Sequence, residues 1–213
     1  MALLTRALEF VVPPFCWECG GSAASGEPLC RRCRVALRWL GEDEVEVSGV
    51  PLWAAVAYEG PARALVGGFK YRGAPGLARP MAAQMAACAP AGFLEPPAAL
   101  VPVPLHPRRR RRRGYNQAER LAVALSGRTR LAVADVLRRQ GPAGRQVGQG
   151  REERLAGIAG SIAMRPRAAP PAAAVLVDDV ATTGATLAAC AATLHAAGSR
   201  SVRAVAYART SGR

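Results

Sequence analysis

Residues 175–187 constrain the fold of this chain more than any other segment. They read VLVDDVATTGATL, an apolar run that ends in two acids and continues into a loop of threonines and glycine. We expect a buried strand that carries Asp178 and Asp179 at its carboxyl end, followed by a helix. Ligands of open α/β sheets bind beyond the carboxyl ends of strands, and helix starts attract anions, so the segment predicts a sugar-phosphate site. The paired carboxylates suit ribose hydroxyls or a hydrated Mg²⁺.

From residue 50 onward, short apolar runs alternate with alanine-rich stretches, which is typical of an α/β domain with a mainly parallel sheet flanked by helices. The expected strands are 53–58, 100–104, 131–137, 173–179 and 201–207. The expected helices are 61–69, 76–89, 117–125 and 185–197. The polar stretch 138–153 has no periodicity and predicts a long mobile loop, of the kind that often serves as a lid.

Length and charge narrow the class of protein. A chain of 213 residues fits one domain with a small appendage. The formal net charge is +14, and Lys70 is the only lysine among 29 basic residues, so arginine carries the excess. That excess fits either a polyanionic partner or the coding bias of a GC-rich genome. No run of about 18 apolar residues and no secretory signal is visible, so we expect a cytoplasmic protein without a membrane span.

Four of the six cysteines form the pattern Cys-x2-Cys-x10-Cys-x2-Cys, at Cys16, Cys19, Cys30 and Cys33. Two such knuckles aim four thiolates at one tetrahedral ion, so we expect a structural zinc site in a small ribbon-like module. A pair of disulfides is disfavoured in a reducing compartment, and a redox site needs only one knuckle.

An acidic stretch between two glycines, 41–49, carries four of the fifteen acids and marks a change of composition. We place a domain boundary within it. A zinc-binding module over 1–45 is then followed by a larger domain over 46–213.

A second segment, 100–117, reads LVPVPLHPRRRRRRGYNQ. A strand that ends in prolines leads into a basic loop, and a backbone loop followed by cations is a suitable seat for a diphosphate. The six consecutive arginines, 108–113, are also explained as a solvated charge cluster, although self-repulsion makes such a run costly to pack without an anion. His106 is interpreted as a polar loop residue rather than a general base.

The segment 175–187 resembles the signature of the type I phosphoribosyltransferases, Asp-Asp-x-x-Thr-x-Gly-x-Thr after an apolar strand. The resemblance implies a fold of that type, in which Asp178 and Asp179 bind the ribose of phosphoribosyl pyrophosphate (PRPP) together with Mg²⁺. It also implies a 5′-phosphate loop formed by Thr182, Thr183, Gly184, Ala185 and Thr186.

The order of Pro-Val-Pro, basic run and Gly-Tyr-Asn-Gln is similar to the competence-associated ComF family within that superfamily, as are the four cysteines and the turn 70–73. This resemblance implies DNA uptake in natural transformation, with competence proteins such as a DNA helicase or translocase as partners. It implies a pyrophosphate loop formed by Leu105, His106, Pro107 and Arg108. Candidate catalytic residues are Lys70, Arg72 and Arg108.

Three functional hypotheses stay open. The first is a PRPP-binding protein that releases pyrophosphate by transfer to an unidentified acceptor; the segment 157–162 departs from the family pattern, so PRPP binding is better supported than transfer. The second is a non-catalytic module that binds single-stranded DNA through backbone contacts and stacking. Its candidate residues are Arg109, Arg110, Arg111, Arg112, Arg113 and Tyr115, with Tyr71 as a second aromatic. The third is a nucleobase-salvage phosphoribosyltransferase.

Overall fold

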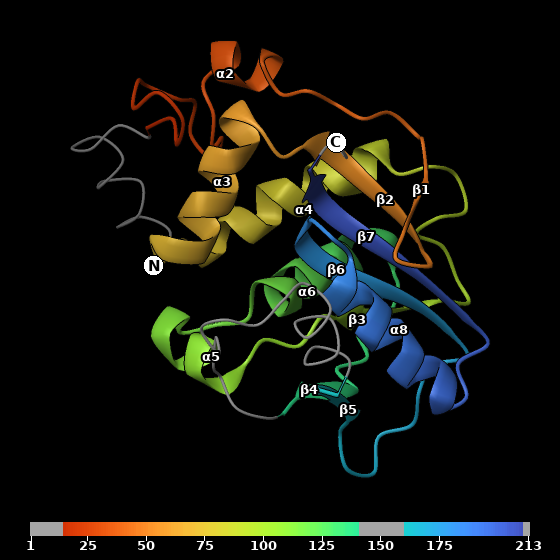
Figure 1. Ribbon diagram of the computed structural model, residues 1–213. Coiled ribbons are helices and arrows are strands. Elements are labelled where there is room, and N and C mark those ends of the chain that lie inside the picture. Colours follow the sequence, from red (N-terminus) through yellow and green to blue (C-terminus); the bar gives the residue numbers. More distant parts are fainter. Residues whose placement is uncertain (1–14, 141–159, 211–213) are drawn as a thin grey trace.

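The computed structural model describes residues 15–140 and 160–210. Its centre is a five-stranded sheet in the order β1-β2-β7-β6-β3 (Figure 1). The strands are β1 (Val45–Val47), β2 (Val50–Ala57), β3 (Ala99–Pro102), β6 (Ala173–Ala181) and β7 (Ser201–Arg209). All neighbouring pairs are parallel except β1 and β2, which form an antiparallel hairpin. The mostly parallel sheet is therefore the one that the alternation of apolar runs predicted.

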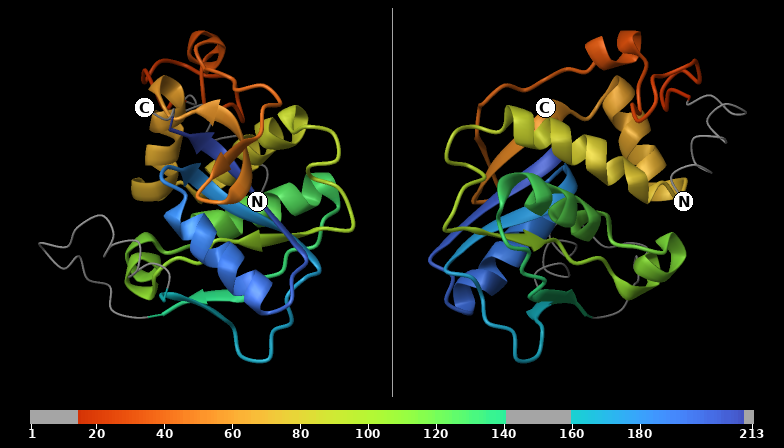
Figure 2. Two further views of the ribbon diagram at one scale, coloured as in Figure 1. Left: turned by 45° about the vertical axis from the view of Figure 1, so that its right-hand side comes forward. Right: turned by 180° about the vertical axis from the view of Figure 1, so that it is seen from behind.

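Helices cover both faces of the sheet (Figure 2). One face is covered by α3 (Gly60–Tyr71), α4 (Ala78–Cys88) and α6 (Gln117–Thr129). The other face is covered by α8 (Ala185–Ala196). β6 and β7 are rich in alanine and valine, as expected for strands that are buried on both faces.

Short elements complete the fold outside the central sheet. They are α2 (Arg31–Val35), η1 (Pro75–Leu77), α5 (Pro107–Arg113) and a two-stranded sheet of β4 (Leu137–Arg139) with β5 (Ile162–Met164). No helix within the described ranges is long and apolar enough to cross a membrane.

The prediction of one strand over 131–137 is wrong. Within that stretch, Val133 forms a single bridge to Leu100 of β3, and regular pairing starts only with β4. A tight turn, in which Val136 N–H donates to Ala134 O, bends the chain away from β3. The turn divides the stretch into two short segments that pair with different partners.

The other predicted helices and strands are confirmed, with ends that shift by at most four residues. The predicted loop 138–153 differs because its first two residues belong to β4. Residues 141–153 of that loop lie outside the described residues, as do residues 157–159 of the atypical segment 157–162.

The acidic stretch 41–49 is part of the sheet. It contains β1, so the predicted domain boundary falls inside a strand. Just before it, Leu40 N–H donates to Ala55 O and the Trp53 indole N–H donates to Gly41 O. The chain is therefore already hydrogen-bonded alongside β2 before β1 begins. The division into a module and a domain stays a prediction.

The cysteine-containing segment packs on α3. The Trp17 ring lies against Gly68, where a Cβ atom would come within 2.5 Å of Trp17 Cε3. Cys16, Leu29 and Leu37 belong to the same hydrophobic cluster as the buried face of α3. This segment therefore shares a core with the sheet and its helices.

Candidate functional site

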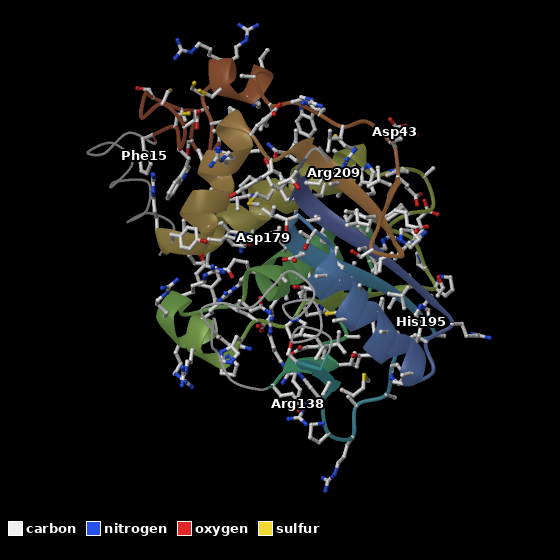
Figure 3. The ribbon with its side chains drawn as sticks, in the orientation of Figure 1. Phe15, Asp43, Arg138, Asp179, His195 and Arg209 are labelled. Carbon is white, nitrogen blue, oxygen red and sulfur yellow. The ribbon has the colours of Figure 1, made fainter. Side chains whose placement is uncertain are left out.

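Two acids lie near the end of β6, at the edge of the sheet where all four parallel strands end. Successive side chains of a strand alternate between faces, so Asp178 and Asp179 point to opposite sides of the sheet. Asp179 faces α3, and Lys70 Nζ lies 2.8 Å from its Oδ1. The side chains are only 5% and 18% exposed, respectively, so this ion pair is nearly buried. Figure 3 labels Asp179 between α3 and β6.

Asp178 lies on the opposite face, the one covered by α8. Its Oδ1 accepts a 2.8 Å hydrogen bond from Asp179 N–H. Burial and the charge of Asp179 raise the pKa of Asp178 to about 7, against the attraction of Lys70. Burial and a neighbouring like charge both disfavour the ionised form of a carboxyl group. A cation or hydrogen-bond donors from a ligand would stabilise its charged form.

The raised pKa predicts a pH dependence of stability. The Asp178 carboxyl titrates near its ordinary value of 3.8 when unfolded and near 7 when folded. The protein is therefore most stabilised by this group below about pH 4, where the carboxyl is protonated in both states. Between about pH 4 and pH 7 the free energy of unfolding falls by up to about 4 kcal/mol. The variant Asp178→Asn lacks this titration, so its stability relative to the parent should increase over that range. Urea unfolding near pH 4.5 and near pH 7.5 tests this.

The exposed Glu46→Gln exchange on β1 is the matched control for that experiment. It should leave the pH profile unchanged. A stability difference between the parent and Asp178→Asn that is equal at the two pH values would contradict the prediction.

The predicted phosphate loop, 182–186, joins β6 to α8. Gly184 is the N-cap of α8 with φ +74°, a conformation that glycine adopts without strain. The loop lines a small hollow of about 40 Å³ together with Asp178 and Val180. The first residues of α8 line the same hollow. The first N–H groups of any helix have no hydrogen-bond acceptor inside that helix. The loop thus offers N–H donors and a helix dipole to an anion, next to a carboxyl group.

The basic run 108–113 is helical, and the prediction of a loop there is wrong. Helix α5 starts with Pro107, which suits a first helical position, and arginine is a good helix former. The His106 ring caps the helix, because its Nδ1 accepts a hydrogen bond from Arg108 N–H. The helix ends at Gly114 with φ +80°. The four residues predicted as a pyrophosphate loop therefore include the cap and first turn of a helix; they are Leu105, His106, Pro107 and Arg108.

The arginines of α5 are held in different ways. Arg110 pairs with Glu119 at 3.1 Å. Arg113 donates to Gln117 Oε1 at 2.9 Å, and its guanidinium carbon lies 5.1 Å from the centre of the Tyr71 ring. Four further arginines of the helix are exposed, namely Arg108, Arg109, Arg111 and Arg112.

Tyr115 does not offer a surface on which a base could stack. It is buried, its hydroxyl donates to Phe69 O, and its ring centre lies 5.7 Å from that of Phe69. Tyr71 is 68% exposed, but Arg113 lies over its ring. Only one of the two aromatic residues proposed for nucleic acid therefore faces solvent.

Arg139 is a basic residue near the acids that the sequence analysis missed, because it falls at the start of the stretch predicted as a loop. It ends β4 and is half-buried. Burial and repulsion from Arg109 lower its pKa, while Cys190 and Asp178 act in the opposite direction. A cation held by β4 therefore lies in the electrostatic surroundings of Asp178, on the face opposite Lys70.

The other two candidate catalytic residues lie on the surface. Arg72 and Arg108 are exposed and form no ion pair with either carboxylate within the described ranges. Both histidines act elsewhere, since His106 caps α5 and His195 hydrogen-bonds a main-chain oxygen beyond the other end of α8 (Figure 3). Carboxylates and cations therefore define the site.

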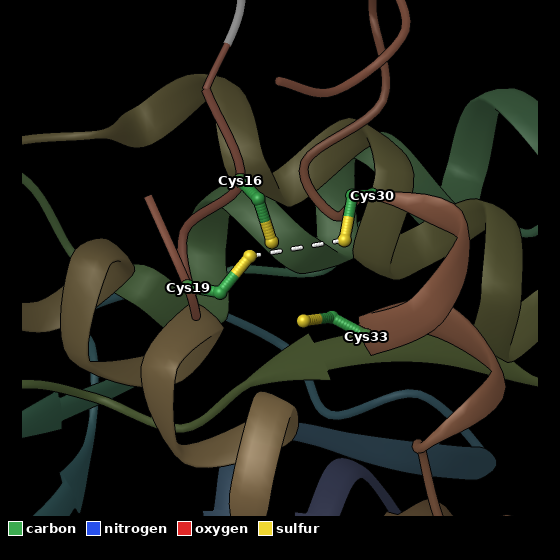
Figure 4. A group of neighbouring side chains, drawn as sticks. All are labelled: Cys16, Cys19, Cys30 and Cys33. Carbon is green, nitrogen blue, oxygen red and sulfur yellow. Dashed lines mark hydrogen bonds between the residues drawn. The ribbon is translucent and has the colours of Figure 1, made fainter. Parts of the chain in front are cut away.

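The four clustered cysteines converge on one point (Figure 4). Their Sγ atoms all lie within 4.8 Å of one another, and those of Cys19 and Cys30 are 3.8 Å apart. A tetrahedral zinc ion with Zn–S bonds of about 2.3 Å needs S–S edges of about 3.8 Å. The cluster could therefore hold a metal such as zinc. Four protein ligands leave no open position, which is typical of a structural site.

The electrostatics of the cluster favour a bound cation. None of the six cysteines forms a disulfide. Burial opposes ionisation of Cys16, but nearby backbone N–H groups outweigh it and lower the pKa to about 6. Burial and the neighbouring thiols raise the pKa of Cys33 to about 12. All four sulfurs become thiolates together only when a cation lies among them.

Comparison of the sequence with known protein families and with curated proteins finds no match. The acid pair with its loop and the cysteine cluster are the two features of the molecule that indicate a function. These two sites lie on different elements of one molecule.

Proposed function

We propose that this chain is a PRPP-binding protein with a type I phosphoribosyltransferase fold, of the ComF kind. One observation carries the proposal: two acids lie near the carboxyl end of a buried strand of a parallel sheet, and a glycine-containing loop joins that strand directly to a helix. In this proposal the 5′-phosphate lies on the loop 182–186. Asp178 and Asp179 take the ribose hydroxyls, and hydrated Mg²⁺ binds beside them.

The cations around the acids suit the pyrophosphate of PRPP. Lys70 contacts Asp179 from the α3 side of the sheet. On the other side, the charge of Arg139 is influenced by Asp178 and by Arg109 of α5. Transfer would break the bond between ribose C1 and pyrophosphate, leaving positive charge on the ribose and negative charge on the leaving group. Cations held in place stabilise that leaving group, and Mg²⁺ supplies further positive charge when bound.

The cysteine cluster supports a folding role for zinc beside this site. It lies in a segment that shares a core with α3, and α3 carries Lys70. Metal at the cluster would therefore stabilise the helix that supplies one cation of the site.

The biological role that we propose, DNA uptake in the cytoplasm together with a helicase or translocase, is supported by the resemblance of the sequence motifs. The acceptor is an unidentified nucleophile. Pyrophosphate release measured with bases, amines and nucleic acids in turn would identify it, and release with a free nucleobase alone would favour the salvage hypothesis.

A second candidate function is binding of single-stranded DNA without catalysis. The exposed arginines of α5 favour it, because such arginines attract a phosphate backbone. The burial of Tyr115 weakens it, because binding of single strands relies on aromatic stacking as well as charge. We therefore rank PRPP binding first.

Thermal unfolding with and without Mg-PRPP tests the proposed function. Saturating Mg-PRPP should raise the melting temperature of the parent by about 5 °C or more, because a ligand at a hundred times its Kd adds about 2.7 kcal/mol. The variant with Asp178→Asn and Asp179→Asn should lose this shift. A control with Glu42→Gln and Asp43→Asn removes two exposed acids and should keep it.

An unchanged melting temperature of the parent in Mg-PRPP, or an equal shift in the Asp178 and Asp179 variant, would refute the proposal. Oligonucleotide binding that weakens steeply with salt and is lost when Arg109, Arg111 and Arg112 are replaced by alanine would then favour the second candidate.

A further inference from the structure

The hairpin of β1 and β2 contacts the predicted phosphate loop, although the two are 135 residues apart in the sequence. Ser48 Oγ donates a 2.8 Å hydrogen bond to Thr183 O. Val47 packs on Gly184 so closely that a Cβ atom on Gly184 would clash with Val47 Cγ1. The turn of the hairpin therefore lies directly against the loop.

The backbone of the turn shows that the Ser48 hydroxyl has a role of its own. Val47 pairs with Val50, so Ser48 and Gly49 form a two-residue hairpin loop. Both have positive φ, 52° and 78°, as the favoured type I′ turn requires. A serine is strained in this region whereas glycine is not. Compared with glycine, serine at position 48 costs backbone strain and adds the hydroxyl that hydrogen-bonds Thr183 O.

The hydrogen bond from Ser48 to Thr183 O also fixes the direction of the Gly184 N–H. The Thr183 carbonyl and the Gly184 N–H belong to one planar trans peptide and point in opposite directions. With the carbonyl held on the Ser48 side, the N–H is directed to the other side of the loop. Within the described ranges, no main-chain acceptor is hydrogen-bonded to this N–H. Glycine permits this peptide to flip, so an external hydrogen bond is needed to select one orientation.

We propose that Ser48 is a positioning residue for the phosphate loop: its hydroxyl holds the Thr183–Gly184 peptide so that the Gly184 N–H is presented to a bound phosphate. The inference rests on the proposed function for the identity of the ligand. It extends the site to the acidic hairpin, which the sequence analysis treated as a boundary between domains.

Two variants separate the hydroxyl from the strain of the turn. Ser48→Gly removes the hydroxyl and relieves the positive φ, so its melting temperature should equal or exceed that of the parent. Ser48→Ala removes the hydroxyl and keeps the strain, so it should melt at a lower temperature. If the hydroxyl positions the loop, both variants should bind Mg-PRPP about fivefold more weakly, as expected for the loss of one neutral hydrogen bond.

Amide hydrogen exchange in the ligand-free protein gives a measurement that does not depend on PRPP. Exchange at 183–186 should be about fivefold faster in both variants, with exchange in β6 unchanged. Parental affinity and parental exchange in Ser48→Gly would overturn the inference. If the parent does not bind Mg-PRPP, the proposed function fails, and the exchange rates alone decide whether Ser48 positions the loop.

Discussion

Replacing Cys33 by serine should lower the melting temperature of the whole chain by about 10 °C or more. Cys33 is buried, and its sulfur is one corner of the tetrahedral cluster. Loss of one ligand removes most of the binding free energy of a structural zinc, which is folding free energy. Because the cluster segment shares a core with α3, the effect should spread beyond the cysteines. A loss of about 3 kcal/mol corresponds to about 10 °C in a chain of this size.

The matched control is Cys88→Ser, which changes a half-buried cysteine outside the cluster and should shift the melting temperature by less than about 3 °C. Metal analysis should find one zinc per parent chain, and a chelator should reproduce the effect of Cys33→Ser. A parent that contains no metal and has four freely titratable thiols in the cluster, or a Cys33→Ser variant as stable as the parent, would refute structural zinc.

Replacing Lys70 by methionine should destabilise the protein by about 3 kcal/mol. Asp179 is nearly buried, and Lys70 Nζ contacts it at 2.8 Å. Removing the cation leaves a buried carboxylate without its partner, which costs far more than the net stabilisation from the pair. Burial lowers the pKa of Lys70, but the charge of Asp179 and the hydrogen bond to it, together with the charges of Asp178 and Tyr58, raise it overall. Urea unfolding at neutral pH measures the loss.

Adding Asp179→Asn to the Lys70→Met variant should recover most of that loss, since no charge is then left unpaired. The exposed pair of Arg38 and Glu59, at 3.3 Å, provides the control. Arg38→Met should cost less than about 1 kcal/mol, because exposed ion pairs contribute little. A Lys70→Met variant as stable as the parent, or no recovery in the double variant, would show that the contact is not an energetically coupled buried pair.

Two local patterns in the sequence correctly predicted what the structure brings together. The cysteine knuckles span 18 residues, and their spacing alone makes the sulfurs converge. The strand, acids and helix of 173–197 also follow from nearby residues, because an apolar run, a glycine and an alanine-rich stretch each have a local backbone preference.

Two misinterpreted segments also carried local signals, which outweigh what their charge alone indicates. The arginine run forms α5 because a proline, a histidine cap and a terminal glycine outweigh the repulsion between like charges. The hairpin in the acidic stretch carried a usable signal, since valine alternates with glutamate before a Ser-Gly pair and another valine. Composition drew attention to the acids, whereas the alternation indicated the strand.

The sequence by itself determined that this chain has a strand-acid-loop-helix element and a four-cysteine cluster, because both arise from contacts between residues close in the chain. Only the tertiary structure decided which residues surround them. Lys70 contacts Asp179, and Ser48 contacts Thr183, because parallel strands bring their carboxyl ends to one edge and the hairpin extends the same sheet. No local periodicity encodes contacts between such distant segments; they follow from strand order and from which helix covers each face.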